Sequence, residues 1–155
     1  MKVLPGFLLV LVSLGCVDIH ADKRVLVDSP IVLSPTPYVI RPKSPLRGIG
    51  PFNEICLDLP PEYRLGSEDW GANMWRVGRP DGSFVEPQVV LIDPEGNEEP
   101  VPLLGFSLGR SRQVCFDSRP SRDLKRRYLA IRLSADDTLT IHAVRWAAGH
   151  RYAGI

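Results

Sequence analysis

Proline and glycine recur along this sequence and restrict it to short secondary-structure elements. The 155-residue chain contains 15 prolines and 13 glycines. Proline lacks the N–H that a helix interior needs, and glycine favours turns, so long helices are disfavoured. No segment shows sustained helical periodicity, although residues 121–127 could form a single turn. The pattern predicts short strands joined by turns.

Alternating apolar residues mark the strands expected between these turns. The clearest pair, residues 128–133 and 138–146, is predicted to form a closing hairpin. Residues 79–82 and 93–97 have an early proline and a late glycine, as tight turns do. Strands of this length and spacing predict an all-β fold, a single β-sandwich or jelly-roll-like domain. Further strands are expected at residues 55–59, 73–77, 83–85, 88–92, 100–104 and 112–116.

The first 21 residues have the pattern of a cleaved secretory signal. Lys2 supplies a positive charge, and residues 7–14 are an uncharged apolar run. That run is shorter than the ~20 residues that a membrane-spanning helix needs. We therefore expect an exported protein.

The sequence is compatible with two alternative cleavage sites. Residues 13–16, Ser-Leu-Gly-Cys, resemble the lipobox of bacterial lipoproteins, in which Cys16 would be lipidated and become the amino terminus. Lipoboxes prefer leucine and a small residue where this chain has Ser13 and Leu14. Alternatively, Ala21 ends an ordinary signal peptidase site, and the mature chain starts at Asp22.

The lipobox resemblance also implies a location. Val17 stands where Gram-negative lipoproteins of the inner membrane have aspartate, which implies an outer-membrane lipoprotein facing the periplasm. The membrane would then be a partner through the lipid anchor. The other cleavage site predicts a soluble periplasmic or secreted protein. We divide the chain into a signal peptide (1–21), a proline-rich arm or tether with an edge strand (22–50) and the β-sandwich (51–155).

The cysteine count predicts a disulfide bond. Lipidation or removal of Cys16 leaves Cys56 and Cys115, an even pair in an exported chain. Strand alternation places both on the less apolar faces of their strands. Neighbouring strands of one sheet would bring them together most simply, so we predict a Cys56–Cys115 bond.

The charge is nearly balanced, with 19 Lys and Arg against 18 Asp and Glu, which argues against a nucleic-acid partner. One segment is locally basic, and in an envelope protein it could meet anionic lipid, lipopolysaccharide or another protein, or be a solvated loop. The residues of this predicted anionic-surface patch are Arg119, Arg122, Lys125, Arg126 and Arg127.

Two patterns suggest chemistry, and neither is convincing. Residues 105–109 match the G-x-S-x-G motif around Ser107, but a nucleophile elbow needs a helix after the serine and a strand is expected instead. The acidic segment 93–99 has its glycine out of place for a calcium loop and is interpreted as a turn with solvated acids. His142 and His150 lack the spacing of zinc ligands. We predict no catalytic residue, metal or cofactor.

Aromatic residues suggest a carbohydrate-binding alternative, because their rings stack on sugars. Residues 128–133 and 139–146 also resemble the final strands of galactose-binding-like jelly rolls, which favours that fold. The first-choice hypothesis is a non-enzymatic envelope lipoprotein that binds or scaffolds an envelope protein or glycan; a serine hydrolase using Ser107 is a distant third. The candidate stacking residues are Tyr63, Trp70, Trp75 and Trp146.

Overall fold

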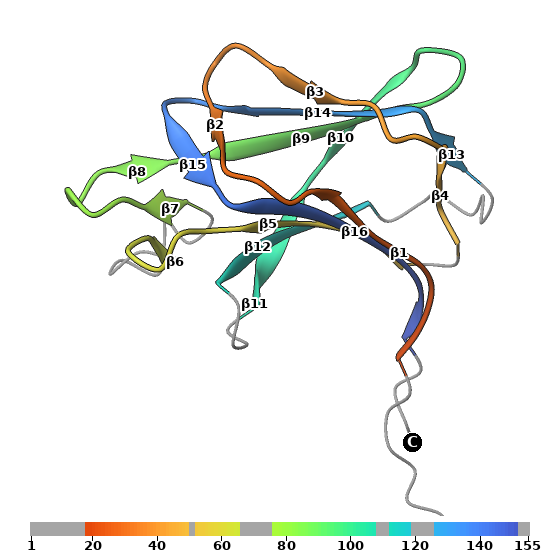
Figure 1. The fold of residues 1–155 in the computed structure, drawn as a ribbon, viewed down its shortest axis with the longest axis horizontal. Helices are drawn as coiled ribbons and strands as arrows, with labels where there is room; N and C mark the ends of the chain where they lie inside the picture. The colour runs from red at the N-terminus through yellow and green to blue at the C-terminus, as the bar shows by residue number, and fades with distance from the viewer. Residues whose placement is uncertain (1–17, 50–51, 66–75, 108–111, 119–125, 152–155) are drawn as a thin grey trace, which may run out of the picture.

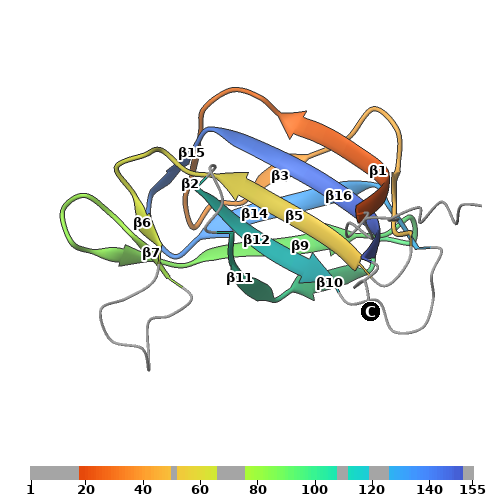
Figure 2. The same ribbon diagram turned by 90° about the horizontal axis from the view of Figure 1, so that it is seen from below.

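The protein is an all-β sandwich, and in the part of the chain described by the computed structural model no residue is helical. Two antiparallel sheets face each other (Figures 1 and 2). The structure describes residues 18–49, 52–65, 76–107, 112–118 and 126–151. The five-stranded sheet has the order β1 (Asp18–Val27), β16 (Ala143–Arg151), β5 (Phe52–Asp58), β12 (Gln113–Ser118) and β11 (Leu103–Ser107). The four-stranded sheet has the order β10 (Glu98–Val101), β9 (Pro87–Ile92), β14 (Ala130–Ala135) and β3 (Tyr38–Ile40).

Smaller ladders lie at the two ends of the sandwich. Figure 1 places β4 and β13 at the same end as the beginning of β1 and the end of β16, and β6 to β8 at the opposite end. We call the first of these the β1-start end. Its ladder joins β4 (Leu46–Arg47) to β13 (Arg127–Tyr128). The other ladders are β2 (Ile31–Leu33) with β15 (Leu139–Ile141), and β6 (Arg64–Leu65), β7 (Val77–Gly78) and β8 (Phe84–Val85).

Strand alternation builds the core between the two sheets. Successive side chains of a strand point to opposite faces, so every second residue is available for burial. Ile55 and Leu57 of β5 and Ile131 and Leu133 of β14, in the other sheet, are all fully buried and belong to one core cluster. Trp146 is also fully buried, and its ring meets that of Tyr128 edge to face at 6.1 Å.

The Cys56–Cys115 disulfide is present, as the cysteine count predicts. The two residues are direct partners in the β5–β12 ladder, and their Cα atoms are 4.1 Å apart. On the same face, the Asp58 carboxylate accepts a hydrogen bond from Gln113 of β12 at 2.6 Å and another from Arg145 of β16 at 2.8 Å. The disulfide joins β5 to β12, and the Asp58 carboxylate joins β5 to both β12 and β16. These contacts hold the three middle strands of the sheet in register.

The predicted closing hairpin is wrong. β14 pairs with β9 and β3 in the four-stranded sheet, whereas β16 pairs with β1 and β5 in the other. The chain between them crosses from one sheet to the other, and β15 pairs with β2 on the way. Alternation identifies which face of a strand is buried, but it does not identify the neighbouring strand. That is why the strands were predicted and their pairing was not.

The segment 22–50, interpreted as an arm or tether with an edge strand, is part of the sandwich. It supplies most of β1, which lies at the edge of the five-stranded sheet, and all of β2, β3 and β4. Leu33, Ile40 and Leu46 from this segment are core residues. Its prolines fall outside these strands, in the connections, where no ladder N–H is needed. The described sandwich thus begins with β1 and not at residue 51.

The disulfide should contribute strongly to stability. It links positions 59 residues apart, and the chain-entropy model gives ~4 kcal/mol for closing a loop of that length. We expect the variant Cys56→Ala/Cys115→Ala to lose most of this in denaturant unfolding. Wild-type protein treated with a reductant should lose a similar amount. Equal unfolding midpoints for the oxidised protein and the variant would contradict the prediction.

Candidate functional site

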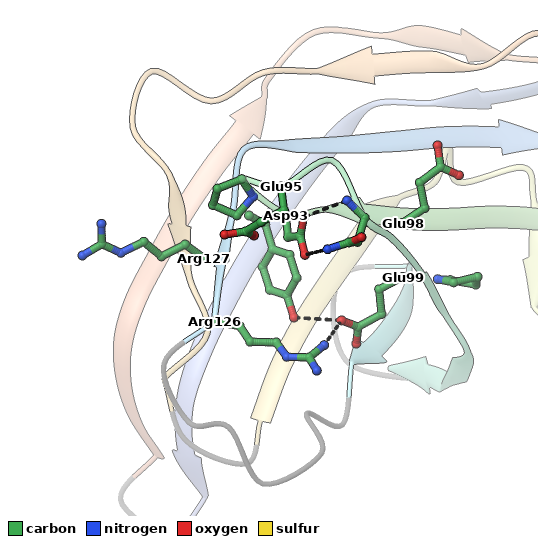
Figure 3. Close-up of a pocket in the computed structure, with 10 residues that line it drawn as sticks. Asp93, Glu95, Glu98, Glu99, Arg126 and Arg127 are labelled. Atoms are coloured by element: carbon green, nitrogen blue, oxygen red, sulfur yellow. Dashed lines mark hydrogen bonds and ion pairs between the residues drawn. The ribbon is translucent and has the colours of Figure 1, made fainter.

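A polar groove of about 640 Å³ opens at the β1-start end of the sandwich, between the β9–β10 turn and β13 (Figure 3). Its walls carry both acids and arginines, so it offers hydrogen-bond donors and acceptors side by side. The lining residues are Asp93, Pro94, Glu95, Asn97, Glu98, Glu99, Pro100, Arg126, Arg127 and Tyr128.

One wall of the groove is the tight turn between β9 and β10. Gly96 has φ +85°, a left-handed conformation that favours glycine, and its N–H donates to the Asp93 carbonyl. The Asp93 carboxylate accepts hydrogen bonds from the backbone and the side-chain amide of Asn97, at 2.7 and 2.8 Å. These bonds, the side-chain one first, lower the pKa of Asp93. Asp93 therefore holds the turn, which agrees with the turn interpretation of this segment.

Glu99 is the central carboxylate of the groove. It accepts hydrogen bonds from Arg126 Nη1 at 2.6 Å and Tyr128 OH at 3.3 Å (Figure 3). Ser118 Oγ of β12 donates a third, at 2.8 Å. Its ladder partner is Leu91, a core residue, so Glu99 occupies an inward-facing position of β10. The prediction that all acids of residues 93–99 are solvated is wrong here, since the Glu99 side chain is only 30% exposed.

The donors around Glu99 respond to its charge and to burial. The Glu99 carboxylate raises the pKa of Arg126. Burial raises the pKa of Tyr128, whose side chain is 1% exposed, so the phenol stays protonated and can donate. Asn53 of β5, the ladder partner of Ser118, is fully buried, and its side-chain amide has no hydrogen-bond partner among the described atoms. A polar layer thus closes the apolar core at this end.

The rim of the groove is held by a second ion pair. Arg132 of β14 donates both terminal nitrogens to the two oxygens of Glu98. This bidentate contact lowers the pKa of Glu98. The groove acids Asp93, Glu98 and Glu99 therefore each have a hydrogen-bond donor, and no histidine or cysteine is among the lining residues.

The structure describes only part of the predicted basic patch. Arg119, Arg122 and Lys125 lie outside the described residues. Arg126 and Arg127 are adjacent in sequence but serve different purposes. Arg126 turns toward Glu99, whereas Arg127 is exposed and directed away from it (Figure 3).

The predicted aromatic stacking face is not assembled in the described structure. Trp146 is fully buried in the core, which corrects its assignment as a ligand-binding residue. Tyr63 is partly buried against the core beside β6, at the end opposite the groove. Trp70 and Trp75 lie outside the described residues. Tyr128 is the only aromatic residue lining the groove, and it is too buried to present its ring to a sugar.

Ser107 lies in a strand and far from the described histidine. It ends β11 and pairs with Gln113 of β12, so a strand returns after it where a nucleophile elbow would need a helix. The ladder continues from Gln113 through Asp58 to Ala143 of β16. Three strand spacings, ~14 Å in total, therefore separate Ser107 from the neighbourhood of His142. His142 is exposed, as its strand parity predicted, and His150 has no described side chain.

One group of metal-ligating residue types occurs in the described chain, at Glu54, Cys56 and Cys115. Both sulfurs are used in the disulfide and are not available as thiolates. The group therefore offers a single carboxylate ligand and is not a candidate metal centre.

Several groove residues escaped sequence analysis for a physical reason. Glu99 and Ser118 were not singled out, although Glu99 shares strand parity with the apolar residues Val101 and Leu103. That parity was the available signal that Glu99 faces inward. Ser118 and Tyr128 reach Glu99 from two other strands, and only the three-dimensional pairing brings them together.

Comparison with known proteins gives no match: no protein-family model, curated protein or solved structure matches this chain. The described residues include no helix long and apolar enough to cross a membrane.

The Glu99 cluster should stabilise the β1-start end. We expect Glu99→Gln to lower the free energy of unfolding by ~1 kcal/mol, because charged hydrogen bonds to Arg126 and Ser118 are weakened in a half-exposed position. Glu95→Gln is the matched control, since Glu95 is an exposed acid of the same groove, and it should change stability by less than ~0.5 kcal/mol. Equal effects of the two substitutions in denaturant unfolding would contradict the prediction.

Proposed function

We propose that this chain is an exported envelope lipoprotein, anchored through Cys16, whose β-sandwich has a non-enzymatic binding or scaffolding role. The anchoring part of the proposal is supported chiefly by the pairing of residues 18–20 with β16. The binding part is supported by the polar groove at the same end of the sandwich. The anchoring part and the binding part are independent, so an experiment can disprove one and leave the other standing.

The beginning of β1 favours cleavage before Cys16 over cleavage after Ala21. β1 starts at Asp18, the second residue after Cys16, and its ladder with β16 includes Asp18, Ile19 and His20. Cleavage after Ala21 would remove these residues and leave the end of β16 without its partner. Cleavage before Cys16 keeps the ladder complete. An unpaired strand end is a site of misassociation, so the complete ladder is the better mature form.

Export is supported by the disulfide. Cysteine pairs form and persist in oxidising compartments such as the periplasm, and are rare in the bacterial cytosol. Cys56 and Cys115 are direct ladder partners and already meet at bonding distance.

A binding role is supported by the state of the groove. Asp93, Glu98 and Glu99 are each held by a hydrogen-bond donor from the protein, so their carboxylates are fixed in place. Exposed polar atoms of Glu95 and Arg127 remain for a polar partner surface.

The anchor is tested on the mature protein isolated from a Gram-negative host. Intact-mass and amino-terminal peptide analysis should show a diacylated Cys16 as the first residue. The Cys16→Ser variant should lose the lipid and its partition into detergent, while keeping the same β-sandwich. A wild-type protein that begins at Asp22 and carries no lipid would overturn the proposal of an anchor.

The absence of hydrolase activity is tested at Ser107. Because Ser107 lies in a β-ladder ~14 Å from the neighbourhood of His142, Ser107→Ala should leave both the unfolding midpoint and the cellular phenotype unchanged. A fluorophosphonate probe should not label Ser107. The non-enzymatic proposal would be contradicted if the probe labels Ser107, or if the protein hydrolyses an ester and Ser107→Ala abolishes that activity.

A further inference from the structure

A second, smaller depression lies beside the groove and is strongly basic. Its volume is about 230 Å³, below the range typical of sites for drug-sized ligands. Its lining residues come from β1, from β13, and from β4 and the residues beside it, and Figure 1 places these strands together at the β1-start end. The lining residues are Asp22, Arg24, Ser44, Pro45, Arg47, Ile49 and Arg127.

The charges of this depression do not cancel. Asp22 is its only carboxylate, and Arg24 uses it, with Nε 2.7 Å from the Asp22 Oδ1 atom. Arg24 is fixed further by hydrogen bonds from Nη1 to the carbonyl and hydroxyl oxygens of Ser44, at 3.0 and 2.8 Å. No carboxylate among the described residues pairs with the side chain of Arg47 or of Arg127. Two arginine side chains, those of Arg47 and Arg127, therefore have no ion-pair partner among the described residues and lie next to Arg24, which is held in place.

The two unbalanced arginines are direct partners in the antiparallel β4–β13 ladder. Directly opposed residues share a face of the sheet, and like charges in this position repel each other. Both side chains are exposed, and neither has a hydrogen-bond or ion-pair partner among the described residues. An oxyanion between them would relieve the repulsion, because guanidinium groups bind phosphate with paired, charge-assisted hydrogen bonds.

The depression is also close to the proposed anchor. Asp22 is four residues along β1 from Asp18, ~13 Å in an extended strand, and six residues from Cys16. With at most ~3.6 Å per residue, the chain places the depression within ~22 Å of Cys16. A lipid on Cys16 would hold that residue at the membrane surface, so phospholipid headgroups would be the most concentrated anions nearby.

We propose that Arg24, Arg47 and Arg127 bind the phosphate of an anionic phospholipid headgroup and thereby orient the sandwich on the membrane. The closeness to the membrane rests on the proposed lipid anchor, whereas the binding of phosphate rests on the arginines alone. The second contact would turn a flexible attachment at one point into a fixed orientation, with the β1-start end directed toward the bilayer.

The first measurement examines phosphate binding and does not depend on the anchor. The mature protein is titrated with inorganic phosphate and with glycerol phosphate, and the NMR signals of the arginine Nε–H groups and of the β4 and β13 amides are followed. We expect saturable shifts at Arg24, Arg47 and Arg127, and binding that weakens as salt is added. Arg47→Gln/Arg127→Gln should weaken binding roughly tenfold or more.

A matched control removes the same charge at the opposite end of the sandwich. Arg64→Gln/Arg112→Gln changes two exposed arginines near β6 and the start of β12, and it should leave phosphate binding unchanged. In phosphate-free buffer, Arg47→Gln/Arg127→Gln should melt at the same temperature as wild type or higher, because a repulsion is removed. Unsaturable shifts, or equal weakening by the control, would overturn the proposal.

The second measurement identifies the source of the phosphate. The mature protein is added to phosphatidylcholine vesicles with or without phosphatidylglycerol, and hydrogen exchange of the β4 and β13 amides is compared. Phosphatidylglycerol should slow this exchange in wild type and in the control variant, but not in Arg47→Gln/Arg127→Gln. Two results would overturn the headgroup assignment. One is phosphate binding in the absence of any protection by phosphatidylglycerol, and the other is protection that is lost only when an envelope protein competes for the same arginines. A chain that starts at Asp22 yet shows the protection would refute the anchor and leave the headgroup site standing.

Discussion

The double pairing of β5 is the constraint on which the rest of the sandwich depends. This strand forms ladders with both β12 and β16, and its inward residues Ile55 and Leu57 are fully buried against the other sheet. Its outward face is fixed by the Cys56–Cys115 bond and by the Asp58 carboxylate. Because β5 fixes the register of β12, Ser118 lies opposite Asn53 and donates to Glu99 of the polar groove. The described lining residues of the groove and of the basic depression come from β1, β4, β10, β13 and the connections beside them.

The groove and the depression differ in whether their arginines have an ion-pair partner among the described residues. In the groove, Arg126 and Glu99 are satisfied by each other, and a ligand there would compete with or extend existing hydrogen bonds. In the depression, Arg47 and Arg127 face each other with no described carboxylate between them. Arg126 turns toward Glu99 in the groove, whereas the exposed Arg127 lines both the groove and the depression. A count of basic residues in the segment could not separate these roles.

Sequence analysis identified the fold class and the disulfide because both follow from local pattern. Proline and glycine spacing excluded long helices, and the parity of Cys56 and Cys115 predicted a bond between neighbouring strands. Local residue pattern does not identify which strands pair. For that reason β14 and β16 were wrongly joined in one hairpin, and β1 to β4 were interpreted as an arm. Trp146 was assigned to a ligand because an aromatic side chain fits a core and a binding face equally well. The groove was missed since its donors come from strands distant in sequence.

On the proposed export of the chain, the ladder between β1 and β16 would determine the order in which the sheet forms. β1 occupies residues 18–27 and β16 residues 143–151, so the edge of the five-stranded sheet would close only after more than a hundred intervening residues had crossed the membrane. Contacts so distant in sequence form slowly. The β5–β12 ladder partners would emerge before β16 and could be oxidised while β1 is still unpaired. During that interval β1 would be an unpaired strand beside the translocation machinery, and a lipid on Cys16 would hold it at the membrane surface, away from other unfolded chains.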